Sequence, residues 1–317
     1  MDGKVEPSVL ESPYPMRTSS STTAVPGRRR AAITAPWWFV VPAAAAFVFV
    51  VVVPSAQAIF YSFTNWDGFT SVFEMVGLEN YRSALENPNA LRALRNTIAL
   101  TVLVTALQMV LALALALALN SQVKSRNALR VLFFSPVVLT SVAVGYIWQF
   151  MLKPTGVLNQ LLSFVGLGSL RHDWLGDPSV NLWAIGGITV WQSVGFTMVI
   201  YLAGLQSVPA EIIEAAYLDG AGPWQRFWYV IRPSIAPATL INSVLCVVGG
   251  LKLFDVVFIT TAGGPAYSST TLATLTYTDG FVPGNYTLGV TLSVLLSLLV
   301  TLVAIVQFRL LRSRDAA

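Results

Sequence analysis

The chain has 317 residues and a formal net charge of +4, and 55% of its residues are hydrophobic whereas only 11% are charged. Soluble domains carry about 25% charged residues, so this composition excludes an ordinary water-exposed surface. The basic residues lie between apolar stretches and do not gather into a patch, which argues against a nucleic-acid-binding protein. We therefore expect an integral membrane protein, with membrane lipid as its surroundings.

The N-terminal residues 1–35 are rich in Ser, Thr, Pro and Arg, and they predict a disordered cytoplasmic segment. They lack the short apolar stretch and the cleavage site of a signal peptide, so the first apolar stretch is expected to stay in the membrane. Arg28, Arg29 and Arg30 are expected to anchor that stretch at the inner membrane surface.

Apolar stretches of about 20 residues predict a protein that crosses the membrane about six times as helices. They cover approximately residues 36–61, 97–119, 131–151, 182–206, 236–260 and 287–308. The predicted fold class is therefore an all-α integral membrane protein, with a six-span domain over residues 36–312 and a tail over 313–317.

The distribution of Lys and Arg predicts the orientation of the helices, because cytoplasmic loops carry an excess of basic residues. If the N-terminus is cytoplasmic, 13 of the 19 basic residues fall on the inner side. They are Lys4, Arg17, Arg28, Arg29, Arg30, Lys124, Arg126, Arg130, Arg226, Arg232, Arg309, Arg312 and Arg314. Both termini are therefore predicted to be cytoplasmic.

A cytoplasmic segment at residues 207–235, between the fourth and fifth spans, carries the clearest functional signal. Pro209 and Glu211 favour the start of a short helix, and Gly220 and Gly222 favour its end. Physical chemistry alone leaves two interpretations open. The helix is either a plain connector or a surface whose small residues let another protein approach closely.

The order of residues in this segment resembles the EAA loop of permease subunits in binding-protein-dependent ABC importers. Glu214-Ala215-Ala216 is followed after three residues by Gly220 and after nine more by Val230, and then by Pro233. Val230 stands where isoleucine is common in the family, and Arg232 stands where leucine is common. The departure at Arg232 puts the end of the loop in doubt, whereas neither departure alters the predicted helix.

The resemblance extends over about residues 36–312 and points to carbohydrate importers of the maltose or lactose type. Its most specific stretch is Phe254-Asp255 followed by Thr261-Ala262-Gly263-Gly264-Pro265. This stretch is similar to the first of the two permeases in a sugar system. The resemblance implies a type I ABC importer permease fold with a MetI-like core, located in the bacterial cytoplasmic (inner) membrane.

In that family the EAA helix docks into a cleft of an ATPase subunit and transmits its closure. The resemblance implies this coupling role for Glu214, Ala215, Ala216, Asp219 and Gly220. It further implies a heterodimer with a second homologous permease, two ATPase subunits and an extracytoplasmic sugar-binding protein. The function expected from it is translocation of a sugar or oligosaccharide, with ATP and Mg used by the ATPase partner.

No catalytic or metal-binding group is expected in this chain. It contains no Gly-x-x-x-x-Gly-Lys-Ser/Thr phosphate loop, so ATP hydrolysis is assigned to a partner. His172 is the only histidine and has no cysteine or acidic cluster at metal-ligand spacing, which argues against a zinc site or a catalytic triad. We therefore expect no enzyme activity and no cofactor bound by the chain itself.

Polar side chains inside the predicted spans are candidates for a substrate pathway. Lys252 and Asp255 are three residues apart, so a continuous helix would place them on one face, where they could pair. Gly249-Gly250 just before them would weaken that helix. Amide and aromatic side chains suit sugar binding, although each can equally be ordinary packing. The full candidate set is Tyr146, Trp148, Gln149, Trp191, Gln192, Asn242, Lys252 and Asp255.

Three other functions remain open from the sequence. A permease for a non-sugar solute such as a glycerol phosphate should place several cations along its pathway, whereas Lys252 is the only one in the predicted spans. An ion-coupled secondary transporter would use Asp255 as its titrating group, but the sequence shows no internal repeat. A membrane scaffold that transports nothing would not need Asp255 in the membrane.

Overall fold

The computed structural model describes residues 3, 37–121 and 124–312. The expectations for residues 1–35, apart from Gly3, and for residues 313–317 therefore lie outside the described residues. The chain divides into two units, residues 1–48 and residues 49–317, which are described separately. The regular secondary structure of the described ranges is helical, apart from an isolated antiparallel bridge between Thr64 and Met75. The predicted all-α class is confirmed.

The first unit contains a short 3₁₀ turn at Trp37–Val40 and α1 (Val41–Phe47). The second unit contains fourteen α-helical segments, several of them joined by π-helical turns. They are α2 (Val53–Tyr61), α3 (Glu79–Glu86), α4 (Pro88–Asn120), α5 (Arg126–Val138), α6 (Ser141–Met151), α7 (Val157–Phe164), α8 (Asn181–Gln206), α9 (Ala210–Leu218), α10 (Pro223–Arg226), α11 (Arg232–Ser234), α12 (Ala236–Leu251), α13 (Asp255–Thr261), α14 (Leu272–Leu275) and α15 (Tyr286–Arg312).

Five helical segments of the described chain are long and apolar enough to cross a membrane. They are Trp38–Tyr61, Pro88–Asn120, Asn181–Gln206, Ala236–Thr261 and Tyr286–Arg309. The predicted third span, 131–151, is instead a pair of helices, α5 and α6, bent by 98°. The expected six crossings are reached when this bent pair is counted as one span.

The bend between α5 and α6 has a local cause in the sequence. Pro136 lies in the last turn of α5 and has no amide hydrogen to donate to the preceding turn. Leu139 and Thr140 then adopt extended conformations, and the Thr140 hydroxyl accepts a hydrogen bond from the backbone amide of Ala143. This N-cap starts a new helix in a different direction, so the predicted continuous span was wrong at this point.

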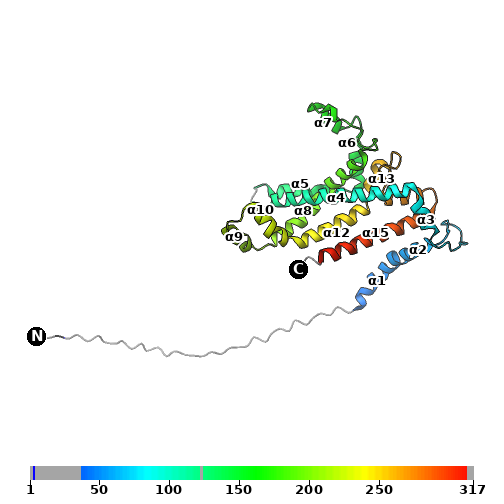
Figure 1. Cartoon of the computed structure of the whole chain (residues 1–317), viewed down its shortest axis with the longest axis horizontal. Helices are drawn as coiled ribbons and strands as arrows, with labels where there is room; N and C mark the ends of the chain where they lie inside the picture. The colour runs from blue at the N-terminus through cyan, green and yellow to red at the C-terminus, as the bar shows by residue number, and fades with distance from the viewer. Residues whose placement is uncertain (1–2, 4–36, 122–123, 313–317) are drawn as a thin grey trace. The chain divides into compact units, whose positions relative to one another are not determined.

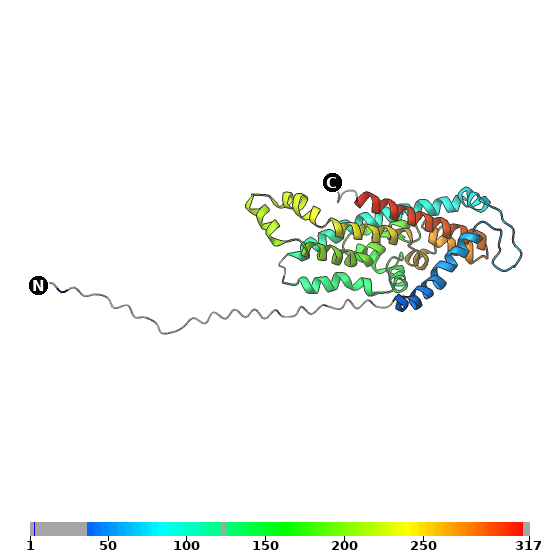
Figure 2. The same ribbon diagram turned by 90° about the horizontal axis from the view of Figure 1, so that it is seen from below.

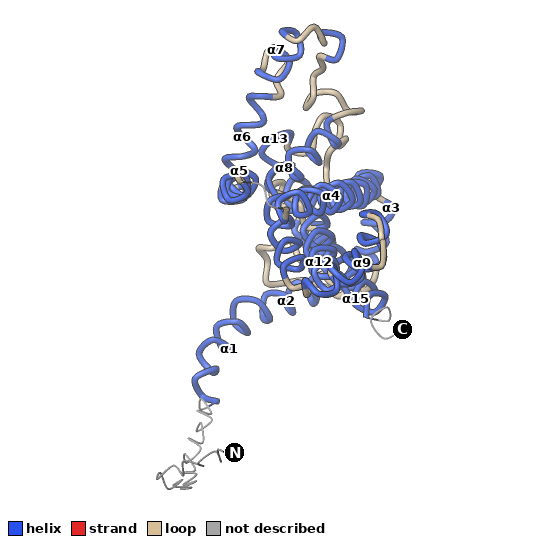
Figure 3. Tube along the Cα trace, turned by 90° about the vertical axis from the view of Figure 1, so that its left-hand side faces the viewer, coloured by secondary structure: helices blue, strands red, loops and turns tan. Residues whose placement is uncertain are grey.

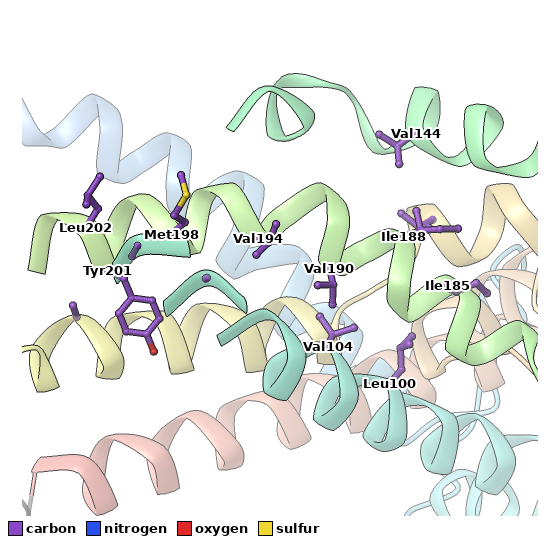
Figure 4. Packing of buried hydrophobic residues seen from close by; sticks show 14 of the residues in the cluster. Leu100, Val104, Val144, Ile185, Ile188, Val190, Val194, Met198, Tyr201 and Leu202 are labelled. Atoms are coloured by element: carbon purple, nitrogen blue, oxygen red, sulfur yellow. The ribbon is translucent and has the colours of Figure 1, made fainter. Parts of the chain in front are cut away.

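The core of the second unit lies where α4, α8 and α12 pack side by side (Figures 1 and 2). Figure 4 shows Leu100 and Val104 of α4 beside Ile185 and Val190 of α8, within one buried cluster. Buried amides also connect the helices. Gln108 of α4 donates to the hydroxyl of Thr197 on α8 at 2.7 Å. Such interhelical hydrogen bonds satisfy polar groups that water cannot reach in a membrane.

Different helices lie at the two ends of the second unit. The segment α9–α10 lies at one end of the bundle and α3 lies at the opposite end (Figures 1 and 2). The helices α6 and α7 project away from the bundle formed by α4, α8 and α12 (Figure 3). Because α8 ends at Gln206 and α9 begins at Ala210, α8 connects the interior of the bundle directly to the α9 end.

Candidate functional site

The helix predicted from the EAA-like motif is α9, and its boundaries follow from its terminal residues. Pro209 is the N-cap residue, and Gly220 follows the C-cap with a φ of +78°, a left-handed conformation that glycine adopts without strain. The amide of Ala221 donates to the carbonyl of Ala216 at 3.0 Å, and the amide of Gly220 donates to the carbonyl of Tyr217 at 3.1 Å. This pair of bonds is a Schellman motif, which fixes the end of the helix.

The five predicted coupling residues lie together on α9 and on the turn that follows it. Glu214, Ala215, Asp219 and Gly220 are exposed, whereas Ala216 is partly covered. The sequence interpretation missed the aromatic and aliphatic surface beside them. It consists of Tyr217, Leu218, Trp224 and Tyr229, whose relative exposures are 67%, 84%, 71% and 80%. The concentration of aromatic residues at 224–229 was the signal for this surface.

Two arginines make cation–π contacts with aromatic residues of the coupling segment. The Arg226 guanidinium lies over the Tyr217 ring at 5.4 Å, which connects α10 to α9. The Arg232 guanidinium lies over the Trp228 ring at 4.6 Å. Cation–π contacts of this kind stabilise the packing of an exposed surface. The arginine that departs from the usual family pattern thus packs on a neighbouring aromatic ring.

A cavity of about 390 Å³ lies within the second unit, between α8 and two interrupted helices. Its lining combines hydroxyl, amide, aromatic and charged groups. The residues are Val137, Ser141, Thr189, Gln192, Ser193, Phe196, Gly249, Lys252, Leu253, Phe254, Asp255 and Val256. Three of the predicted pathway residues, Gln192, Lys252 and Asp255, therefore meet in one place.

The second interruption separates the two predicted charges. The helix α12 ends at Leu251 with Lys252 as its C-cap residue, and α13 begins at Asp255. The ion pairs within 4 Å in the described part of the chain are Arg82–Glu86 and His172–Asp177, so Lys252 and Asp255 do not form the pair that the sequence allowed. The broken helix removes the one-face register on which that expectation depended.

Each of these two charges is favoured by the end of its own helix. The C-terminus of a helix favours a cation such as Lys252, and the first turn favours an anion such as Asp255. Both residues are exposed and line the cavity. The break itself is held in place because the Thr271 hydroxyl donates to the carbonyl of Leu253 at 3.0 Å. Both charged groups are thus available to a solute in the cavity.

The other predicted pathway residues fall into two groups. Trp148 and Gln149 of α6 contact neighbouring helices and are not among the residues that line the cavity. The Trp148 ring packs edge-to-face on Trp191 at 5.4 Å, and the Gln149 amide is 3.4 Å from the carbonyls of Ile259 and Thr260. Tyr146 is 52% exposed and, like Trp191, is absent from the cavity lining.

Asn242 lies elsewhere. It is buried between α12 and α8, where its side-chain nitrogen donates to the carbonyl of Thr197 at 3.2 Å. This is a helix-packing contact. The sequence interpretation also missed Thr189, Ser193 and Phe196 of α8, although their spacing with Gln192 places all four on one helical face.

The loop after α13 is fixed by two buried asparagines. Asn96 of α4 donates to the carbonyls of Ser268 and Thr270, each at 3.0 Å. Asn181, the first residue of α8, donates to the carbonyl of Gly264 at 2.9 Å and to the hydroxyl of Ser268 at 2.6 Å. These bonds fix the segment that follows the cavity. Within the described ranges, no group of three His, Cys, Asp or Glu side chains is placed to hold a metal ion.

Membrane-spanning helices that are interrupted beside a polar cavity are typical of membrane transport proteins. The chain belongs to the family of binding-protein-dependent transport system inner membrane components, which it matches over residues 93–314. Members of this family are transporter subunits and not enzymes. The family predicted from the EAA-like motif is confirmed.

Individual relatives agree with this assignment. The chain is 32% identical to the multiple sugar-binding transport system permease protein MsmF of Streptococcus mutans, over 81% of this chain and 88% of that protein. It is 31% identical to the sn-glycerol-3-phosphate transport system permease protein UgpA of Brucella suis, over 82% and 89% of the two chains. A bacterial ABC transporter involved in the import of the acidic polysaccharide alginate has the same fold, with a TM-score of 0.76, 21% identity and coverage of 87% and 94%.

Proposed function

We propose that this chain translocates a sugar or oligosaccharide as one of two permeases in an ATP-driven importer. An extracytoplasmic binding protein delivers the substrate, and a second, homologous permease completes the pathway. Two ATPase subunits, which use ATP and Mg, bind the α9 end of the bundle. Both termini of the chain lie in the cytoplasm, as its basic residues favour.

The observation that carries this proposal is the continuity of α8. Gln192 and Ser193 of α8 line the cavity, and the same helix ends at Gln206, with three residues between it and the start of α9 at Ala210. A helix transmits displacement along its axis because its backbone hydrogen bonds hold it rigid. A pull on α9 by a closing ATPase therefore moves a wall of the cavity, as alternating access requires.

The surface of the α9 end fits a protein partner. Tyr217, Leu218, Trp224 and Tyr229 expose large apolar side chains beside the carboxylates of Glu214 and Asp219. Contiguous apolar surface rimmed by charge is typical of a protein–protein contact, in which aromatic residues supply most of the binding energy. The proposed ATPase contact is built from this surface and the five predicted coupling residues.

The chemistry of the cavity supports a polyhydroxylated substrate. Ser141, Thr189, Gln192 and Ser193 offer hydrogen-bonding groups, and Phe196 and Phe254 offer aromatic faces. Hydrogen-bonding groups placed beside apolar and aromatic side chains are typical of small-molecule sites. A relative named for multiple sugars favours the same substrate class.

A glycerol phosphate is the second candidate, because a relative of similar identity is named for sn-glycerol-3-phosphate. A phosphate group is normally bound by several cationic or amide donors. The cavity lining contains Lys252 as its cation, with Asp255 three residues away. The sugar interpretation is therefore preferred. Membership of a binding-protein-dependent family argues against the ion-coupled transporter and against the scaffold.

Purification of the complex tests the partners. A variant with Cys246→Ala and Ala215→Cys places a single thiol on the exposed face of α9. We expect a thiol-directed crosslinker to attach it to a co-purifying ATPase. The matched control, Cys246→Ala with Ser169→Cys, places the thiol in an exposed loop beyond α7 and should attach to no ATPase. Absence of an ATPase from the α9 crosslink, or its presence in the control, would contradict the proposal.

A further inference from the structure

The cavity holds one positive and one negative side chain that do not form an ion pair with each other. Lys252 and Asp255 both line it, both are exposed, and they are absent from the ion pairs found in the described ranges. The other lining residues are apolar or neutral polar. The cavity is therefore electrically balanced and contains one strong donor and one strong acceptor.

The helix break keeps the two charges apart. Lys252 is stabilised at the C-terminal end of α12, and Asp255 is stabilised in the first turn of α13. Neither charge needs the other for compensation. A solute in the cavity can thus accept a hydrogen bond from the Lys252 ammonium and donate one to the Asp255 carboxylate. Charge-assisted hydrogen bonds of this kind are about twice as strong as neutral ones.

From this arrangement we infer that Lys252 and Asp255 determine the specificity of the pathway, selecting neutral polyhydroxylated solutes and rejecting anionic ones. This inference rests on the proposed function and sharpens its substrate class. A hydroxyl group can donate and accept, so a pair of neighbouring hydroxyls matches both charges. A carboxylate or phosphate can only accept when ionised, so it gains from Lys252 and is repelled by Asp255.

The balance of charge can be measured without knowing the substrate. In a chain with Cys246→Ala and Ser193→Cys, a single thiol lies in the cavity wall. Its rates of modification by an anionic reagent, sulfonatoethyl methanethiosulfonate, and by the cationic trimethylammonioethyl reagent report the local potential. The thiol of Ser169→Cys, in the exposed loop beyond α7, is the matched control.

The ratio of the modification rate by the anionic reagent to that by the cationic reagent should depend on both charges. Removing the negative charge and removing the positive charge should shift this ratio in opposite directions. We expect Asp255→Asn to raise the ratio about threefold to tenfold and Lys252→Gln to lower it by a similar factor, as a unit charge at close range predicts. The double variant should return to the original ratio, and the control thiol should not respond. Unchanged ratios in both single variants would overturn the inference.

A transport measurement then tests selection itself in the complete importer. We expect uptake of neutral glucose oligosaccharides and no uptake of the corresponding uronic acids or of glycerol 3-phosphate. Asp255→Asn should allow uptake of the anions and so reduce the difference in uptake between neutral and anionic solutes. Uptake of the anions by the unaltered protein would overturn the inference. Failure of the proposed function has a separate signature, because the α9 crosslink to an ATPase would then be missing while the rate ratios could still shift.

Discussion

The side-chain nitrogen of Gln192 donates a hydrogen bond to the main-chain oxygen of Leu139 at 3.1 Å. Gln192 belongs to α8 and lines the cavity, whereas Leu139 is the C-cap residue that follows α5 at the 98° bend. The bond therefore ties the wall of the cavity to the interrupted third span. Both interruptions, the one at Leu139–Thr140 and the one at Lys252–Phe254, border the same cavity.

The first prediction concerns this bond. Gln192→Leu keeps approximately the size of the side chain but removes the amide donor of the exposed bond to the carbonyl of Leu139, at a cost of about 0.5–1.5 kcal/mol. We expect normal membrane insertion and uptake reduced severalfold, measured in cells with matched expression. Gln160→Leu removes a similar amide-to-carbonyl bond, to Thr155 in the loop beyond α6, and should leave uptake unchanged. Equal uptake in both variants would contradict the role of Gln192.

A charge reversal tests the α9 surface. Glu214→Lys places a cation where the exposed face of α9 carries a carboxylate, so it should repel a partner that binds that face. We expect unchanged membrane insertion and loss of ATPase from the purified complex, with uptake abolished. Glu79→Lys reverses a similar charge on α3, at the other end of the bundle, and serves as the control. Normal uptake by Glu214→Lys would count against the coupling role.

The turn after α9 gives a third prediction. Gly220 has a φ of +78°, and a residue with a Cβ in this conformation costs about 1–2 kcal/mol. Gly220→Val should therefore distort the end of α9 and abolish uptake while the protein still inserts, because a β-branched residue rarely adopts this conformation. Gly222→Ala is the matched control because Gly222 has a φ of −66° and only one ordinary contact at its Cβ position. Uptake by Gly222→Ala should be normal. Loss of uptake in this control would show that the turn tolerates no substitution, so that the conformation of Gly220 is not the specific cause.

The sequence predicted the helices whose signals are local. The first, second, fourth and sixth spans have high mean hydropathy, and α9 is delimited by Pro209 and Gly220. The interruption at Lys252–Phe254 was harder to predict, because Gly249-Gly250 lowers helix propensity without saying whether the helix breaks. The sharp bend depends on how Thr140 caps α6, and this was invisible to a hydropathy pattern.

The candidate site was predicted only in part, for a related reason. Polar residues within spans can face a cavity or a neighbouring helix, and periodicity does not distinguish the two. Gln192, Lys252 and Asp255 face the cavity. Asn242 instead packs against α8, since its amide reaches the carbonyl of Thr197. Only the three-dimensional arrangement of α8 and α12 shows which polar residues line the cavity and which pack between helices.

A pH prediction concerns the loop before α8. Hydrogen bonds from the side chain and backbone of Ser179, and then the interaction with His172, lower the pKa of Asp177 from 3.8 to about 2. Because this pKa is depressed in the folded loop, the stabilisation is complete above pH 3.8 and is lost as the pH falls through about 2. We expect pepsin to cleave residues 172–180 faster at pH 2 than at pH 4, relative to the unfolded protein. Ser179→Ala should move this increase to higher pH, and an unmoved increase would refute the assignment.

The last prediction uses two adjacent glycines of α12. Glycine in a helix is about 1 kcal/mol less favourable than alanine, so alanine should stabilise any helical position that has room for a methyl group. A Cβ on Gly249 meets no atom within 4 Å, whereas a Cβ on Gly250 lies 3.0 Å from the Cα and from the side-chain methyl of Thr101 on α4.

Gly249→Ala should therefore raise the thermal unfolding temperature of the purified protein slightly, and Gly250→Ala should lower it because α4 and α12 must move apart. The two changes are chemically identical and one residue apart, so differences in helix propensity cancel between them. An equal rise in both variants would mean that α4 and α12 do not approach as closely as the contact with Thr101 requires.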